Sequence, residues 1–189
     1  MRRHFALLAL GLGLALGASC APEAPPPSVE RTISLDRLYD RLRVTDNDDE
    51  AQAIEAAIRH AWAAKGPKAA NSLLAYALDT VHSGQVEVAM VIVEKAIEIA
   101  PGFTEAWMLR SSLHFHMGYP AQAVEDLAHI LAIEPRHFQA LANAGFIMLD
   151  MGDSKGALKA FEASLAIHPH QPDVKEQADK LRTHSARAV

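Results

Sequence analysis

Cysteine, aromatic residues and positive charge are all scarce in this sequence of 189 residues. A single cysteine, Cys20, excludes an internal disulfide and a Cys-x-x-Cys zinc or redox site. Aromatic residues make up 6% of the chain, whereas apolar residues together make up 50%, enough for a packed core. The 18 Lys and Arg residues are outnumbered by 23 Asp and Glu residues, which gives a net charge of -5. This balance argues against nucleic acid as a partner.

Recognisable catalytic motifs are also missing. The sequence contains no GxSxG, HExxH or P-loop motif, and no GxGxxG in a strand and helix context. Its many carboxylates fall on expected helix faces, where solvation is their usual role. We therefore predict that the protein is not an enzyme and that it needs no cofactor.

Residues 1–19 have the pattern of a signal peptide for export. Arg2 and Arg3 precede an apolar run over residues 5–18, which is too short to remain in a bilayer as a spanning helix. Cys20 follows this leader directly, and an unpaired cysteine in an exported chain needs an explanation. A Pro-rich stretch over residues 20–31 follows, which we interpret as an extended tether.

The end of the leader, Leu16-Gly17-Ala18-Ser19-Cys20, resembles a bacterial lipobox, although Gly17 stands where that family most often has Leu. The resemblance implies that the leader is removed before Cys20, that Cys20 carries fatty acyl chains including palmitate, and that these anchor the protein in a membrane. Ala21, where Asp would signal inner-membrane retention in enteric bacteria, favours the outer membrane. The expected location is the periplasmic side of the bacterial envelope. The alternative is ordinary cleavage near residues 18–21, with Cys20 incidental.

Beyond the tether, several residue types recur every 34 residues. The positions in this frame are Pro67, Pro101, Pro135 and Pro169, then Gly84, Gly118 and Gly152, then Ala89, Ala123 and Ala157. Apolar residues between them follow helical spacing. Glycine supplies the left-handed end of a first helix, alanine allows a close crossing, and proline ends a second helix. The frame therefore predicts one helical hairpin per unit.

These units resemble tetratricopeptide repeats (TPRs), for example in Ala144-Gly145, Ala157, Phe161 and Pro169 of the third unit. The resemblance implies an all-α solenoid of helical hairpins with three full repeats, at residues 70–103, 104–137 and 138–171. We interpret residues 32–69 as a degenerate helical hairpin in the place of a fourth unit. Residues 172–189 are expected to hold a capping helix and a tail.

In this family the first helix of each unit lines a concave groove that binds a partner. The family's contact positions predict these partner-binding residues: Asn71, Leu74, Leu78, His82, Glu105, Met108, Ser112, Phe115, His116, Gln139, Ala142, Asn143, Phe146 and Asp150. Of the Lys and Asn clamp that holds a carboxylate in some relatives, only Asn143 is present. We therefore expect an apolar peptide, a helix or the chain's own terminus in the groove. The alternative is that several of these side chains pack inside the superhelix.

His82, His116 and Asp150 form a column in the same frame. Two imidazoles and a carboxylate suit zinc or iron, so the alternative function is a periplasmic metal or cofactor carrier. Adjacent helices lie about 10 Å apart, however, which is too far for metal ligands at about 2 Å unless the side chains converge. His168 and His170 form a weak metal motif, because residues two apart point to different sides of a helix.

We favour a protein-binding adaptor or scaffold of the cell envelope. Its architecture is similar to that of NlpI-type protease adaptors and of assembly factors, a likeness of fold alone. The expected partners are a protein or peptide in the groove and a membrane at the lipid anchor. The identity of the protein partner and the oligomeric state are left open by the sequence.

Overall fold

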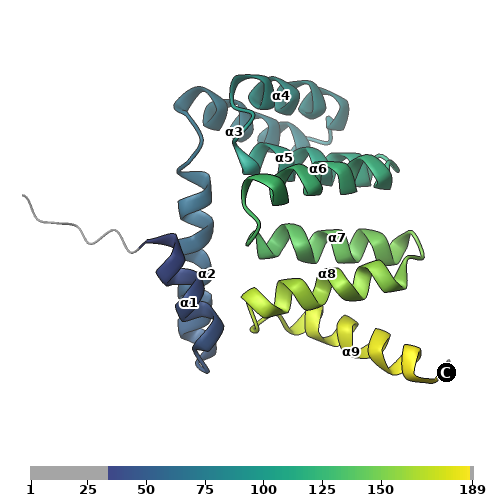
Figure 1. Ribbon diagram of the computed structural model, residues 1–189. Helices are drawn as coiled ribbons and strands as arrows, with labels where there is room; N and C mark the ends of the chain where they lie inside the picture. Colours follow the sequence, from purple (N-terminus) through teal and green to yellow (C-terminus); the bar gives the residue numbers. More distant parts are fainter. Residues whose placement is uncertain (1–33, 188–189) are drawn as a thin grey trace, which may run out of the picture. The chain divides into compact units, whose positions relative to one another are not determined.

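The structure, a computed structural model, describes residues 34–187, which form nine α-helices and no strand (Figure 1). The helices are α1 (Leu35–Val44), α2 (Asp48–Ala63), α3 (Lys68–His82), α4 (Val86–Ile99), α5 (Thr104–His116), α6 (Pro120–Ile133), α7 (Phe138–Asp150), α8 (Ser154–Ile167) and α9 (Pro172–Arg187). The predicted signal peptide, the predicted lipidation site Cys20 and the predicted tether lie outside the described residues. Between residues 34 and 187, no helix is long and apolar enough to cross a membrane.

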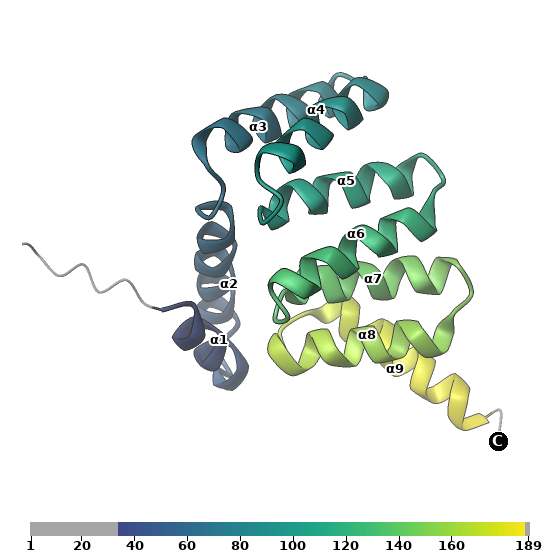
Figure 2. The same cartoon turned by 45° about the horizontal axis from the view of Figure 1, so that its top comes forward.

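Three helix pairs, α3 with α4, α5 with α6 and α7 with α8, form hairpins that lie side by side (Figure 2). The predicted glycine ends are confirmed, because Gly84, Gly118 and Gly152 follow the first helix of each pair with φ of 75°, 82° and 83°. Glycine adopts this left-handed conformation without a steric penalty, so the chain can turn at once into the second helix. The all-α repeat fold expected from the sequence is thereby confirmed.

Small side chains allow the two helices of a hairpin to approach closely. Ala89, Ala123 and Ala157 are all 0% exposed. In the third hairpin, a Cβ on Gly145 would lie 2.5 Å from the ring of Phe161, so only glycine fits there. Apolar clusters continue across the hairpins and join α3 and α4 to α5, α6 to α7, and α7 and α8 to α9. The capping helix α9 therefore completes the core of the last hairpin.

The hairpin of α1 and α2 is present, but it does not occupy the expected place of a fourth unit ahead of α3. Figures 1 and 2 both show α2 running across the ends of the later helices. It packs beside α5, and α1 packs against α8. This arrangement corrects the expectation that residues 32–69 extend the stack as a further repeat.

The first repeat itself explains why no helix of residues 34–187 stacks on its outer side. The side of α3 that a preceding unit would cover exposes Ser72, Tyr76 and Asp79, and Tyr76 is 60% exposed. One and two units later the corresponding side chains are mostly small or apolar and buried, as seen for Ala106, Leu113, Ala140, Ala144 and Ile147. Burying Asp79 without a partner would cost more free energy than the contact gains. The apolar side chains of the α1–α2 hairpin must therefore be buried elsewhere.

Candidate binding surface

The first helices of the three hairpins, α3, α5 and α7, present side chains of similar type in the same order. On α5, Glu105, Met108, Ser112 and Phe115 are spaced i, i+3, i+7 and i+10, so they lie along one side of the helix. Each helix begins with a polar residue on this side and ends with His or Asp. We call this surface the inner face, formed by Asn71, Leu74, Leu78, His82, Glu105, Met108, Ser112, Phe115, His116, Gln139, Asn143, Phe146 and Asp150.

The inner face is accessible and keeps one large apolar side chain of each hairpin exposed. Leu78, Phe115 and Phe146 are 41%, 40% and 39% exposed. The other exposed members are His82, Ser112, His116, Asn143 and Asp150. The partly exposed members are Asn71, Leu74, Glu105, Met108 and Gln139. A partner laid along this face would therefore meet an apolar strip between two polar margins.

Ala142 does not belong to this surface, although the sequence places it there. It is 6% exposed and lies in the apolar cluster that contains Phe161 and Val174. Its methyl group is used to attach α9 to the last hairpin, so a partner cannot reach it. Asn143, the remaining clamp residue, places its amide nitrogen 3.3 Å from the sulfur of Met108 on the neighbouring hairpin.

The His82, His116 and Asp150 column does not form a metal site. In the part of the chain that the structure describes, no three His, Cys, Asp or Glu side chains lie close enough to hold a metal ion. The three residues stand at or near the ends of successive first helices, and their side chains do not converge. The alternative function as a metal carrier is therefore not supported.

Trp62 anchors the α1–α2 hairpin to the turn between α6 and α7. Its side chain is 0% exposed and stacks on His137, with ring centroids 3.7 Å apart. The indole N–H donates to the hydroxyl of Tyr39 at 3.0 Å, and Nδ1 of His137 accepts from the backbone N–H of Ala140 at 3.2 Å. Burial lowers the pKa of His137 to about 4, and nearby Lys65 acts in the same direction. His137 is therefore neutral at pH 7.

Charged groups flank this aromatic contact. Nζ of Lys65, just after α2, lies 3.3 Å from Oε2 of Glu134. The guanidinium of Arg136 pairs with Asp36 and lies 4.2 Å from the centroid of the Tyr39 ring. Both contacts join the α1–α2 hairpin to the same α6–α7 turn. They therefore restrict rotation of the hairpin about the Trp62–His137 stack.

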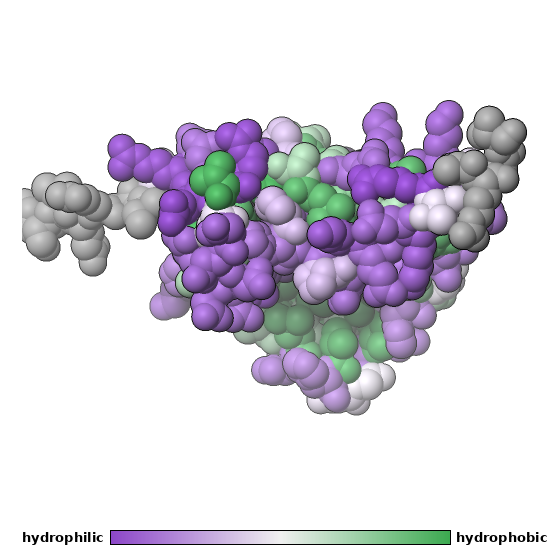
Figure 3. Space-filling model, turned by 90° about the horizontal axis from the view of Figure 1, so that it is seen from below, coloured by the Kyte–Doolittle hydropathy of each residue, from purple (hydrophilic) through white to green (hydrophobic). Residues whose placement is uncertain are grey.

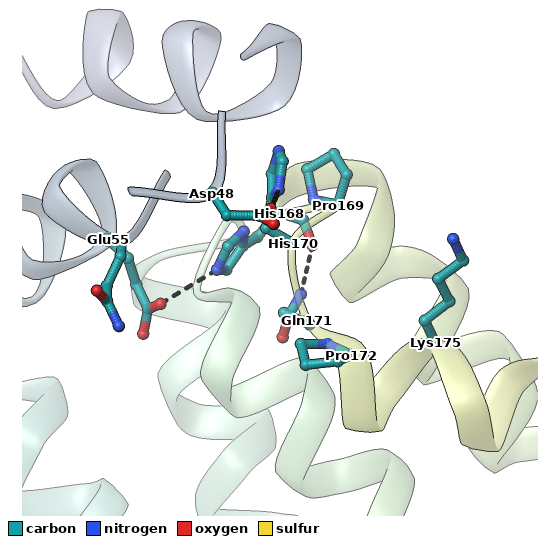
Figure 4. A pocket seen from close by; sticks show the side chains of 9 residues that line it. Asp48, Glu55, His168, Pro169, His170, Gln171, Pro172 and Lys175 are labelled. Atoms are coloured by element: carbon teal, nitrogen blue, oxygen red, sulfur yellow. Dashed lines mark hydrogen bonds and ion pairs between the residues drawn. The ribbon is translucent and has the colours of Figure 1, made fainter. Parts of the chain in front are cut away.

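Two histidines of the turn between α8 and α9 contact α2 (Figure 4). Nε2 of His168 lies 3.2 Å from Oε2 of Glu55, and Nδ1 of His170 lies 2.6 Å from Oδ1 of Asp48. Burial lowers the pKa of His168, although Glu55 opposes the shift. The backbone carbonyl of Thr45 and then Asp48 raise the pKa of His170. The surroundings of His168 thus favour a neutral imidazole ring, and those of His170 favour a cationic one.

Two adjoining cavities lie where α2 faces α7 and the beginning of α9. One has a volume of about 680 Å³ and a mainly polar lining that includes Gln52 and Lys175. The other, of about 270 Å³, reaches Phe138, Gln139 and Phe146 of α7. Because two of these belong to the inner face, the α1–α2 hairpin forms one edge of that face. Figure 3 shows apolar side chains between the hydrophilic surfaces of the α1–α2 hairpin and α9.

This docked hairpin is the feature of the site that the sequence prediction missed. The expectation that His168 and His170 lie on a helix is wrong, because both fall between α8 and α9. A signal was present in the 34-residue frame, since the turn position held by Gly102 in the first repeat holds Arg136 and His170 in the next two. These two side chains are the ones that pair with Asp36 and Asp48 of the α1–α2 hairpin.

Comparison with known proteins agrees with the helical hairpins. A family model described as tetratricopeptide repeat matches residues 104–137. A TPR repeat-containing protein of Rhizobium etli is 31% identical over 192 residues, covering 95% of this chain and 94% of that protein. The chain belongs to the tetratricopeptide repeat family. Its hairpins α3–α4, α5–α6 and α7–α8 are thus TPR units.

Solved TPR structures resemble this TPR protein over about three fifths of its length. The first TPR of Spaghetti (RPAP3), bound to the HSP90 peptide SRMEEVD, has a TM-score of 0.59 at 18% identity and covers 63% of this chain and 94% of its own. The Yersinia enterocolitica secretion chaperone SycD, in complex with a peptide of the translocator YopD, has a TM-score of 0.56 at 12% identity, with coverages of 60% and 92%. At these identities the likeness establishes the fold.

Proposed function

We propose that this TPR protein is an adaptor of the bacterial cell envelope that holds a partner protein or peptide on its inner face. The observation that carries the proposal is the row of exposed apolar side chains Leu78, Phe115 and Phe146, one from each repeat. Scattered apolar residues are common on surfaces, but a row on one face of successive repeats is typical of a docking surface. The similar structures of Spaghetti and SycD each hold a peptide, which supports the same use here.

The envelope location is supported by the N-terminal sequence. Residues 1–19 have the order of a signal peptide, and Cys20 stands where a lipoprotein carries its acyl chains. Several acyl chains hold a protein on a membrane because each buried methylene contributes about 0.8 kcal/mol. The Pro-rich residues 20–31 would then keep the repeats away from the bilayer. An NlpI-like role in delivering substrates to a protease, or a role in assembly, is the finer form of this proposal.

Affinity capture from envelope extracts tests the binding surface. The double variant Leu78→Glu, Phe146→Glu puts two charges into the apolar strip, whereas Val91→Glu puts one on α4, where Val91 is 66% exposed and outside the inner face. We expect the first variant to lose the proteins that wild type captures and the second to retain them. Recovery of the same proteins by all three would refute a role for the inner face.

Labelling cells with a fatty-acid analogue tests the anchor. We expect wild-type protein to take up the label and to sediment with membranes. Cys20→Ala should lose both properties, whereas Ser19→Ala, next to the cysteine, should keep them. Undiminished label in Cys20→Ala would show that the cysteine is incidental.

A further inference from the structure

The charges of the inner face have one sign. At the family's contact positions on α3, α5 and α7 there is no Lys or Arg, whereas Glu105 stands at one margin and Asp150 at the other. The basic residue on α5, Arg110, is directed to α6, where its Nη2 lies 2.6 Å from Oδ1 of Asp126. With histidine neutral, a partner on this face meets apolar groups and carboxylates.

Glu105 is a carboxylate of the inner face that lacks a full ionic partner. It is partly buried at the start of α5, and in the described chain no hydrogen bond or salt bridge joins its side chain to another residue. Burial raises the pKa of the Glu105 carboxyl, and Arg59 of α2 only partly opposes this shift. Arg59 is also shared with Glu55, whose Oε1 lies 3.7 Å from its Nε. A desolvated carboxylate without a full partner is costly by itself, so a bound cation would be favourable there.

The neighbourhood of α2 adds to this acidic margin. Glu55 and Asp48 face the larger cavity, and Asp173 at the start of α9 lines the smaller one. The cations available there are Arg59, which Glu55 and Glu105 share, Lys175, and the ring of His170, which is already paired with Asp48. The margin beside the α1–α2 hairpin therefore suits a positively charged group next to the apolar strip.

Building on the function proposed above, we propose that the partner segment is a basic, apolar peptide. Its apolar side chains cover Leu78, Phe115 and Phe146, and a Lys or Arg side chain beside them pairs with Glu105. An acidic segment would bring like charges together at both margins without a lysine or arginine of the face to balance them. The acidic α1–α2 edge thus selects the charge of the partner, while the apolar strip supplies most of the contact area.

Selection from a library of random peptides displayed on phage tests this inference with the purified full-length chain. We expect the recovered peptides to be enriched in Lys and Arg and depleted in Asp and Glu relative to the starting library. Glu105→Lys should abolish or reverse that bias. Glu125→Lys, the same change at an exposed position of α6 outside the inner face, should leave the bias unchanged.

The affinity of one recovered peptide then measures the pairing between its Lys and Glu105. Replacing its selected Lys by Glu should weaken binding to wild type about tenfold, and Glu105→Lys should restore much of the loss. Glu105→Gln should reduce the preference for Lys without unfolding the domain, because it removes an unpaired charge. Peptides recovered without a cationic bias, or with the same bias in Glu105→Lys, would overturn the inference and leave the adaptor function standing. The adaptor function itself predicts that some recovered peptides bind wild type but not the double variant Leu78→Glu, Phe146→Glu. If no such peptide is found, the adaptor function is contradicted.

Discussion

The stacked TPR units and the α1–α2 hairpin are both pairs of helices, but different contacts hold them in place. In the stack, small side chains such as Ala89 and Ala157 recur in each unit and are completely buried. The α1–α2 hairpin instead depends on a few large groups, above all Trp62 against His137, and on charged pairs around them. A repeated interface distributes its energy over many similar contacts, whereas a docked element concentrates it in an anchor.

Trp62→Ala gives the largest separation between the two regions. Deleting a fully buried aromatic side chain costs about 4 kcal/mol, and here the loss falls on docking because Trp62 joins the hairpin to the α6–α7 turn. Hydrogen exchange should show α1 and α2 losing protection while α3–α9 keep theirs. Phe161→Ala, the matched deletion within the stack, should instead expose amides of α7–α9. Equal loss in all helices of Trp62→Ala would contradict the distinction.

Acid should loosen the docked hairpin before the stack. The pKa of His137 falls from 6.5 to about 4 on burial, so the undocked state binds the proton more readily. The resulting cost is absent above about pH 6.5 and grows to about 3 kcal/mol as the pH falls toward 4. His168 acts in the same direction, and Glu55 beside it reduces the effect.

His170 acts oppositely, because its raised pKa favours the docked state at low pH, and this contribution is lost as the pH rises through the folded pKa. Its partner Asp48 is exposed to solvent, which keeps that contribution small. Fluorescence of Trp62 against pH, recorded with the second tryptophan Trp107 replaced by Phe, measures the balance, because docking buries the indole. His137→Phe, which keeps a ring for stacking but cannot titrate, should flatten the profile between pH 6.5 and 4. If the profile is unchanged in that variant, a group other than His137 causes the pH-dependent change in docking.

Gly145→Ala should weaken the stack and spare the docked hairpin. Its added methyl group would meet the ring of Phe161, and overpacking of this kind costs about 2 kcal/mol. Gly102→Ala is the matched control, because a Cβ there meets nothing within 4 Å. Thermal unfolding should show a lower melting temperature for the first variant alone. A docked hairpin that lost protection in Gly145→Ala would mean that the two regions unfold together.

Arg136→Ala should produce the smallest measurable effect on docking. Arg136 lies over the Tyr39 ring and pairs with Asp36, yet it is 42% exposed, so its loss should cost about 1 kcal/mol or less. Arg43→Ala, which removes an exposed pair within α1 itself, should have no measurable effect. Urea unfolding followed by Trp62 fluorescence in the same Trp107→Phe background compares the two. A larger effect of Arg43→Ala would show that the charged pairs do not secure the docked position.

Much of the fold could be predicted because its contacts are local. Gly84, Gly118 and Gly152 end their helices through their own backbone conformation, and each buried alanine meets a helix of its own or the adjoining unit. Position along a repeat also predicts which side chains share the inner face, whereas their contact with a partner stays a prediction. Ala142 was wrongly assigned to this face because α9, which lies outside the three repeats, covers it.

The sequence by itself determined the 34-residue frame, the helical hairpins and the side of each repeat that remains open. Tertiary structure alone decided where the α1–α2 hairpin lies, and with it the acidic edge of the inner face. The reason is physical: the contacts between Arg136 and Asp36, His168 and Glu55, and His170 and Asp48 span 100, 113 and 122 residues. No periodic pattern links such pairs, so they become neighbours only when the stack has formed and its turns are aligned.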